Sequence, residues 1–259
     1  MKIFICCKQV PDVAMTIQIK DGKFISEGMN YVLNAYDASC VEESLVLKEK
    51  YGAEVTLVLI GDEAGKEALR KGLAMGADNA FHIMDPALNQ IGSQAAAKVL
   101  QAFFKGRDFD FILTGKQAQD SDMGLAGGIL SEMLNLPYVT NAVGLDMADN
   151  KVVVRRQGDE GVEVIHMPMP SLITCSNDMN DPRIPSLKGI MASKKKPMEQ
   201  LSLADLGLSA DEVLRESKKS SLKSFSLPPA RKSGAKIEGD AQTLVATLME
   251  KLTKEAKVL

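Results

Sequence analysis

The sequence is poor in the residues that build metal and disulfide sites. Its 259 residues include no tryptophan, two histidines and four cysteines. Cys6, Cys7, Cys40 and Cys175 form no CxxC pair and lack the Cys/His spacing of a zinc site, so we expect no metal site. They fall in or near predicted buried elements, and we expect four reduced core thiols, as in a cytoplasmic protein.

Long apolar runs and excess positive charge are also missing. No apolar run approaches the roughly 18 residues of a membrane span, and the first residues lack the cationic and apolar regions of a signal peptide. The net charge is −3, so the chain has no broad basic footprint for nucleic acid. We therefore expect a cytoplasmic protein with no membrane span and no nucleic-acid partner.

Catalytic motifs are absent as well. The sequence contains no GxSxG, no HExxH and no Walker GxxxxGK[ST]. Its two histidines, His82 and His166, lie within predicted strands, where packing is a commoner role than catalysis. Catalysis by the chain's own side chains therefore has little support.

What the first half contains is an alternation of two periodicities. Continuous apolar runs, typical of strands buried on both faces, alternate with amphipathic helical segments. This order predicts an α/β fold with a parallel sheet flanked by helices, in which ligands bind beyond the carboxyl ends of the strands. The predicted strands are 2–7, 54–60, 79–84 and 109–114, and the predicted helices are 37–50, 62–75, 89–106 and 122–134.

The pattern changes after Pro137. Four strand-like segments follow, at 138–147, 151–156, 162–166 and 171–175, and their short connections predict an antiparallel hairpin extension of the sheet. From Asn177 the chain is rich in Pro, Lys and Ser, with helical segments at 204–217 and 240–256. The last ~65 residues look too fragmentary to fold alone, so we expect an extended C-terminal arm that wraps a partner subunit.

The stretch from Gly115 to Gly124 is the most informative motif. It follows a predicted strand and opens a predicted helix, so its backbone N–H groups and the positive end of the helix dipole suit a nucleotide phosphate. Asp120 and Asp122 allow two interpretations, a carboxylate pair for acid/base or metal chemistry, or ribose ligands beside a phosphate. Asp122 also fits the N-cap of the following helix.

Two further segments reach the same predicted edge of the sheet. The sequence from Asn34 to Asp37 precedes the first helix, and Asp37 fits its N-cap. The sequence from Lys8 to Asp12 follows the first strand. Together with Cys7, Gly61 and the 115–124 loop, they predict one crevice.

These motifs carry a resemblance to a known family. Residues 7–12 read CKQVPD, 34–37 NAYD, 68–78 ALRKGLAMGAD, 115–122 GKQAQDSD and 181–191 DPRIPSLKGIM, followed by three lysines. In this order and spacing, the chain resembles the beta subunit of electron transfer flavoproteins over its whole length. The resemblance implies a Rossmann-like domain over 1–193 and an arm over 194–259 that wraps an alpha subunit carrying FAD.

The resemblance also implies an adenine nucleotide in the beta subunit. The nucleotide is AMP in simple carriers and a second FAD in electron-bifurcating members, where that flavin takes hydride from NADH and passes electrons to ferredoxin or flavodoxin and to a dehydrogenase. Val13 and Tyr36 would lie towards the alpha-subunit flavin. The cofactor-binding residues carried over are Cys7, Asn34, Ala35, Tyr36, Asp37, Ile60, Gly115, Lys116, Gln117, Ala118, Gln119, Asp120, Ser121, Asp122, Met123, Gly124, Leu125 and Ala126.

The family's partner-recognition segment maps onto residues 182–191. Leu187 would be its apolar anchor for an acyl-CoA dehydrogenase-like enzyme or another flavin dehydrogenase. From the residues alone, packing of Leu187 on its own domain remains the alternative. The lysines at 194–196 fit a solvated charge run or a surface that steers an acidic partner. The docking residues carried over are Pro185, Leu187, Lys188, Ile190 and Met191.

The nucleotide loop departs from both branches of the family. The Thr and Gln of the bifurcating loop DGDTAQVGP are missing here, and so are the polar residues of AMP-type carriers. Small residues at Gly124, Ala126, Gly127 and Gly128 would leave room for a larger ligand, and the KQVPD and NxYD forms look like the bifurcating branch. We favour FAD over AMP.

Two other classes remain open on sequence grounds. A universal-stress-type nucleotide-binding regulator would share the βα pattern and the Gly-rich loop, but it would not need the C-terminal arm. An adenylating enzyme would need a pyrophosphate loop of the SGGxDS type, which this chain lacks.

Overall fold

The computed structural model describes residues 1–88, 91–217, 222–231 and 233–259. The described chain divides into two compact units, and each is treated by itself. The first comprises residues 1–18 and 25–223, and the second comprises residues 19–24 and 224–259.

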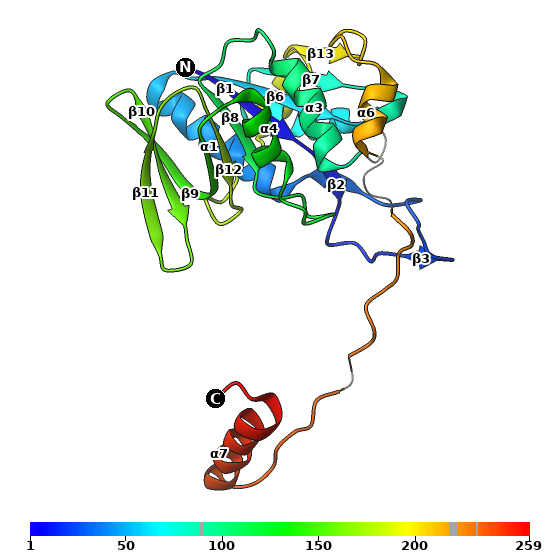
Figure 1. The fold of residues 1–259 in the computed structure, drawn as a ribbon, viewed down its shortest axis with the longest axis vertical. Helices are drawn as coiled ribbons and strands as arrows, with labels where there is room; N and C mark the ends of the chain where they lie inside the picture. The colour runs from blue at the N-terminus through cyan, green and yellow to red at the C-terminus, as the bar shows by residue number, and fades with distance from the viewer. Residues whose placement is uncertain (89–90, 218–221, 232) are drawn as a thin grey trace. The chain divides into compact units, whose positions relative to one another are not determined.

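A nine-stranded sheet forms the centre of the first unit, in the order β11-β10-β9-β12-β8-β1-β6-β7-β13 (Figure 1). Neighbouring strands from β9 through β12, β8, β1, β6 and β7 to β13 pair in parallel. At the other end of the sheet, β10 pairs antiparallel with both β9 and β11, and these three strands form the hairpin extension. The predicted α/β fold with a hairpin extension is confirmed. The strands are β1 (Lys2–Cys7), β6 (Glu54–Ile60), β7 (Asn79–Ile83), β8 (Phe111–Gly115), β9 (Tyr138–Ala148), β10 (Lys151–Gln157), β11 (Val162–Met167), β12 (Ser171–Cys175) and β13 (Met198–Leu201).

Helices cover both faces of this sheet. One apolar cluster joins the sheet to α1 and α2, and a second joins its other face to α3, α4 and α6. Central strands such as β1 and β6 are apolar on both faces because each face meets a layer of helices. The helices are α1 (Ala35–Tyr51), α2 (Gly65–Met75), α3 (Ser93–Phe104), α4 (Ala126–Leu134), α5 (Leu187–Ser193) and α6 (Ala210–Ser217), with a short 3₁₀ helix η1 (Pro86–Leu88).

Three helices begin at different residues from those predicted. α1 begins two residues before Asp37, whereas α2 and α4 begin at Gly65 and Ala126, after irregular segments that the apolar periodicity did not reveal. The predicted helix 89–106 starts at residues 89–90, which lie outside the described residues, and its described part begins at Ser93. Two small antiparallel pairs, β2 (Gln9–Pro11) with β5 (Tyr31–Leu33) and β3 (Ile19–Lys20) with β4 (Lys23–Phe24), were not predicted.

The sheet continues beyond residue 193. β13 pairs with β7, and α6 packs against α3, so residues up to Lys223 group with the sheet in the first unit. This strand was not predicted, because MEQL is short and has little apolar character. The prediction that residues 194–259 form an arm that wraps a partner subunit is not tested by a single chain and stays a prediction.

The second unit joins the β3–β4 pair to the C-terminal residues. Phe225 donates its backbone N–H to the carbonyl of Gly22 (2.8 Å), and its ring lies 6.2 Å from that of Phe24. Helix α7 (Ala241–Glu250) begins at Asp240, whose carboxylate accepts the N–H of Thr243, and continues as a π-helical turn, η2 (Lys251–Ala256). Across the described residues, no helix is both long and apolar enough to span a membrane.

Candidate functional site

A cavity of about 220 Å³ lies at the carboxyl ends of three adjacent parallel strands, β1, β6 and β8. This is the sheet edge where ligands of open α/β folds bind. The cavity is lined by Cys6, Cys7, Lys8, Asn34, Asp37, Val58, Ile60, Ile91, Gly92, Ser93, Ala96, Leu100, Thr114, Gly115, Lys116, Gln117, Ala118, Ser121, Met123, Gly124, Leu125 and Ala126.

The cavity has an apolar wall and a polar side. Val58, Ile60 and Leu100 supply apolar surface, and Lys8 and Lys116 supply positive charge. The starts of two helices also line it, α3 through Gly92 and Ser93, and α4 through Leu125 and Ala126. Since the first turn of a helix carries unpaired N–H groups and a positive dipole end, this arrangement suits a flat apolar base joined to a phosphate.

Side-chain alternation along β1 sends its two cysteines to opposite faces of the sheet. Cys6 packs with Val58 and Leu100 beside α3, whereas Cys7 packs with Leu59 beneath α1 and α2. Burial raises the pKa of both thiols, and the nearby Asp37 carboxylate adds to this effect. Both cysteines therefore stay protonated at neutral pH and act as small apolar groups.

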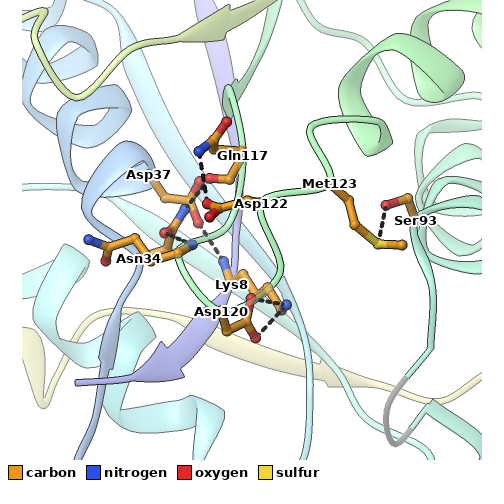
Figure 2. Close-up of polar contacts among 9 residues, drawn as sticks. Lys8, Asn34, Asp37, Ser93, Gln117, Asp120, Asp122 and Met123 are labelled. Carbon is orange, nitrogen blue, oxygen red and sulfur yellow. Dashed lines mark hydrogen bonds and ion pairs between the residues drawn. The ribbon is translucent and has the colours of Figure 1, made fainter. Parts of the chain in front are cut away.

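Asn34 ties the 115–124 loop to the start of α1 (Figure 2). Its side-chain amide donates to the carbonyl of Gln117 (2.9 Å), and its side-chain oxygen accepts the N–H of Gln119 (3.1 Å). The side chain of Gln119 completes the contact by accepting the N–H of Ala35 (3.3 Å). Asn34 is only 1% exposed, so these bonds fix the loop backbone at the cavity.

Lys8 and Gln117 make two further contacts with the loop carboxylates (Figure 2). Lys8 Nζ lies 2.7 Å from both carboxylate oxygens of Asp120, and the Gln117 amide donates to Asp122 (2.8 Å). The predicted N-cap role of Asp122 is wrong. Its carboxylate is engaged by Gln117, its backbone is left-handed (φ 50°), and α4 begins four residues later with Leu125 at the N-cap.

Asp37 joins three segments at the floor of the site. Its carboxylate accepts the N–H of Lys8 (2.7 Å) and the N–H of Gly115 (2.9 Å), so the predicted N-cap role is wrong and the N-cap residue of α1 is Asn34. Burial raises the pKa of Asp37 to about 7, although the two N–H donors act in the opposite direction. A Cβ at Gly115 would lie 2.3 Å from Oδ1 of Asp37, so only glycine fits there.

Most of the predicted site residues line this one cavity, but five do not. Asp120 and Asp122 pair with Lys8 and Gln117, and Ala35 and Gln119 bond to each other. The carbonyl of Tyr36 accepts a hydrogen bond from the thiol of Cys40 (3.3 Å). These five residues shape the loop and the start of α1 without lining the cavity.

The sequence prediction placed Lys8 at this crevice without naming it as a cofactor-binding residue, and it missed Cys6 and the residues contributed by α3. Ser93 contacts Met123 across the cavity, with Oγ and Sδ 3.8 Å apart (Figure 2). The signal for α3 was present, because Gly92-Ser93 before an Ala-rich run marks a helix start at the same sheet edge. The missed lining residues in and just before α3 are Ile91, Gly92, Ser93, Ala96 and Leu100, and the remaining missed ones are Val58 and Thr114.

The structure gives no support for metal chemistry at the two loop aspartates. Among the described residues, no group of three or more His, Cys, Asp or Glu side chains is arranged to hold a metal ion. Asp120 and Asp122 instead accept hydrogen bonds from neighbouring side chains.

The predicted docking residues lie on and just before α5. The hydroxyl of Ser186 caps this helix by accepting the N–H of Gly189 (3.1 Å). Leu187 is 76% exposed, so it does not pack into its own domain. Ile190 and Met191 are exposed beside it, as is Ile184 before it. Leu187, Ile190 and Met191 have the spacing of one helix face. With Ile184 they are called the apolar surface below, and Lys188 beside them is also exposed.

Comparison with known proteins identifies a family. The family model described as the electron transfer flavoprotein domain matches residues 21–206. The chain is 35% identical over 260 residues to the electron transfer flavoprotein subunit beta of Bacillus subtilis (strain 168), with all of both chains covered. It is 36% identical over 263 residues to subunit CarD of the caffeyl-CoA reductase-Etf complex of Acetobacterium woodii, again with both chains fully covered. A Syntrophomonas wolfei protein, also named electron transfer flavoprotein subunit beta, is 35% identical over 260 residues, which cover 100% of this chain and 98% of the relative.

Proposed function

Because this chain belongs to the beta-subunit family of electron transfer flavoproteins, we propose that it pairs with an alpha subunit carrying FAD and holds an adenine nucleotide of its own. The observation that carries this proposal is the cavity at the carboxyl ends of β1, β6 and β8, where two helix starts and two lysines meet an apolar wall.

The residues present fit such a nucleotide. Cys6, Val58 and Leu100 offer an apolar surface for an adenine ring, and the backbone at Gly124 and Ala126 would hold phosphate at the start of α4. Asn34 and Asp37 stabilise this arrangement, because their hydrogen bonds fix the 115–124 loop and the ends of the strands.

We favour FAD over AMP in this cavity, with AMP as the alternative. The similarity to CarD, a subunit of a caffeyl-CoA reductase-Etf complex, supports the larger cofactor, as do the KQVPD and NAYD forms. Gly127 does not make room for the larger cofactor, because its lack of a side chain serves the packing of α4. A Cβ there would lie 2.5 Å from Cγ2 of Thr174 and 2.9 Å from Oγ1 of Thr114.

The proposed activity is electron transfer without acid/base chemistry by the protein. A bound flavin supplies hydride acceptance and one-electron transfer, whereas the chain binds, orients and shields it. With FAD in the cavity, the heterodimer would oxidise NADH and bifurcate electrons to ferredoxin or flavodoxin and, through the alpha-subunit flavin, to a dehydrogenase. With AMP, this subunit would be the structural and docking half of a single-flavin carrier for acyl-CoA dehydrogenases.

The proposed docking partner is an acyl-CoA dehydrogenase or a related flavin dehydrogenase. The apolar surface of Ile184, Leu187, Ile190 and Met191 would enter an apolar pocket on that enzyme. Lys188 and the neighbouring Lys194 and Lys195 would favour a pocket with an acidic rim.

The nucleotide content of the co-expressed heterodimer tests this proposal. Acid release followed by chromatography and mass spectrometry gives the ratio of FAD to AMP per heterodimer. Two FAD and no AMP would support a bifurcating subunit, and one FAD with one AMP would support the single-flavin carrier. A heterodimer with no nucleotide beyond the alpha-subunit FAD would overturn the proposed role of the cavity.

A further inference from the structure

The segment that precedes α5 has no regular secondary structure, yet it is firmly bound to α1. Arg183 donates to the Glu42 carboxylate three times, through its backbone N–H (2.9 Å), Nε (2.8 Å) and one terminal nitrogen (2.8 Å). Its other terminal nitrogen donates to Glu49 (2.6 Å), two turns further along α1. This two-pronged arginine–carboxylate geometry fixes both distance and orientation.

Glu42 lies mostly beneath the surface. Its side chain is 10% exposed, and burial acts to raise the pKa of this carboxyl. The hydrogen bonds from Arg183 outweigh that effect and hold the pKa below its usual range. Glu42 therefore stays ionised at neutral pH, and within the described part of the chain its carboxylate is bound by Arg183.

The residues just before Arg183 are bound to the same helix. The side-chain amide of Asn180 donates to the carbonyl of Ser39 (3.2 Å) and to the Glu43 carboxylate (3.0 Å). The other oxygen of that carboxylate accepts the N–H of Leu145 in β9 (2.9 Å).

The far end of the segment is fixed on α2. A Cβ at Gly189 would lie 2.4 Å from the carbonyl oxygen of Ala74, so α5 approaches the backbone of α2 directly. Arg70 of α2 donates to the carbonyl of Ser193 at the end of α5 (2.9 Å). Between these two anchors, Ile184 and Leu187 are 91% and 76% exposed.

We propose that Arg183, held by the buried Glu42, is a positioning residue that presents Ile184 and Leu187 in one fixed geometry to the dehydrogenase. This inference rests on the proposed docking function of residues 182–191. A preorganised apolar anchor binds more tightly than a mobile one, because less conformational entropy is lost on association.

The test is steady-state kinetics with the intact heterodimer as the electron acceptor of a purified butyryl-CoA dehydrogenase reduced by butyryl-CoA. The variants are Arg183→Ala, Arg183→Lys, Glu42→Gln and Leu187→Ala. Arg156→Ala is the matched control, because the Arg156 side chain is about as exposed as that of Arg183 (32% and 35%) and pairs with a glutamate, Glu163, on the β10–β11 hairpin. Unfolding midpoints and nucleotide content are measured for each variant.

We expect Leu187→Ala to raise KM for the heterodimer about tenfold. Arg183→Ala and Glu42→Gln should each raise KM about threefold at unchanged kcat, since they loosen the anchor without removing it. Arg183→Lys should fall between Arg183→Ala and wild type, because a lysine cannot make the paired bonds. The control variant should match wild type.

Two outcomes would overturn the inference in distinguishable ways. A KM that rises for Arg183→Ala but not for Glu42→Gln would mean that Arg183 touches the partner directly, because Glu42 is buried and its bond to Arg183 would then not matter for docking. A KM that does not change even for Leu187→Ala would show instead that this segment is not the docking surface, and the docking part of the proposed function would fail with it.

Discussion

Asp37 is a carboxylate with almost no access to water, since it is 4% exposed. A buried carboxylate is retained when backbone N–H groups satisfy it, and Asp37 receives those of Lys8 and Gly115. Because Lys8 directly follows β1 and Gly115 ends β8, one side chain holds together the two strand ends that carry the cavity.

The raised pKa of Asp37 makes stability depend on pH. This pKa is about 7 in the folded chain and ordinarily 3.8, so between those values the folded state keeps a proton that the unfolded state has lost. The free energy of unfolding therefore falls as the pH rises through this window, by on the order of a few kcal/mol at most. The Asp37→Asn variant lacks this titrating group, so its free energy of unfolding does not fall in this way. The stability of the variant relative to wild type therefore rises with pH. Urea unfolding of both chains at about pH 5 and about pH 8 measures the change, and a pH-independent difference would contradict it.

Asn34 affects the loop more than the helix it begins. We expect Asn34→Ala to weaken nucleotide binding about tenfold, because the carbonyl of Gln117 and the N–H of Gln119 lose their buried partner. Titration of the nucleotide-stripped heterodimer with the released nucleotide measures this. Asn180→Ala is the control, since Asn180 also makes two hydrogen bonds but contacts α1 away from the cavity. Equal losses in both variants would indicate general destabilisation and contradict the assignment.

At the scale of single elements, α4 shows how two adjacent glycines can have different roles. Gly127 is buried against Thr114 of β8 and Thr174 of β12, where a Cβ would lie within 3 Å of both side chains. At Gly128 the nearest atoms to a Cβ belong to Tyr138, at an ordinary 3.6 Å. The start of α4 at the cavity therefore depends on the absence of a side chain at Gly127.

This contrast predicts opposite effects of two alanine substitutions. Gly127→Ala should lower the free energy of unfolding by about 1–3 kcal/mol, because α4 must move off the sheet. Gly128→Ala should be neutral or stabilising by up to about 1 kcal/mol, because alanine favours the helix. Urea unfolding of the two variants side by side tests the pair, and equal effects would show that α4 does not pack as described.

The three lysines that follow α5, at 194–196, have different surroundings. Lys196 donates to the carbonyls of Leu73 and Ala77 at the end of α2 (2.9 and 2.6 Å), where a cation also suits the helix dipole. Lys194 and Lys195 are exposed. Only these two fit the predicted solvated run that could steer an acidic partner.

At the scale of the whole molecule, the cavity exists because distant segments meet at one sheet edge. A ligand bound there stabilises the fold by mass action. Loading the nucleotide-stripped heterodimer with its released nucleotide at about 100 times Kd should raise the unfolding midpoint by about 3–5 °C. Inorganic phosphate alone at the same concentration is the control. An equal shift with phosphate would mean that the apolar wall of Val58, Ile60 and Leu100 does not receive a base.

Much of this architecture was predictable. The central strands, the hairpin extension and the 115–124 loop follow from local periodicity, turn residues and the meeting of parallel strand ends at one edge. The roles of Asp37 and Asp122 were not predictable, because the sequence alone makes a carboxylate near a helix start look like an N-cap. The hydrogen-bond donors that reach it must be known before its role can be assigned. Here those donors are the N–H groups of Lys8 and Gly115 and the amide of Gln117, which tertiary structure brings close.

The sequence by itself determined the fold class and, through five motif blocks, the family, which leaves the regulatory and adenylating alternatives without support. These properties depend on local pattern, which a chain carries in order. Only the tertiary structure decided that Cys6 faces the wall beside α3, that α3 contributes Ser93 to the cavity, and that Glu42 holds Arg183. Those contacts join residues far apart along the chain, and no periodicity specifies which distant partner a side chain will meet.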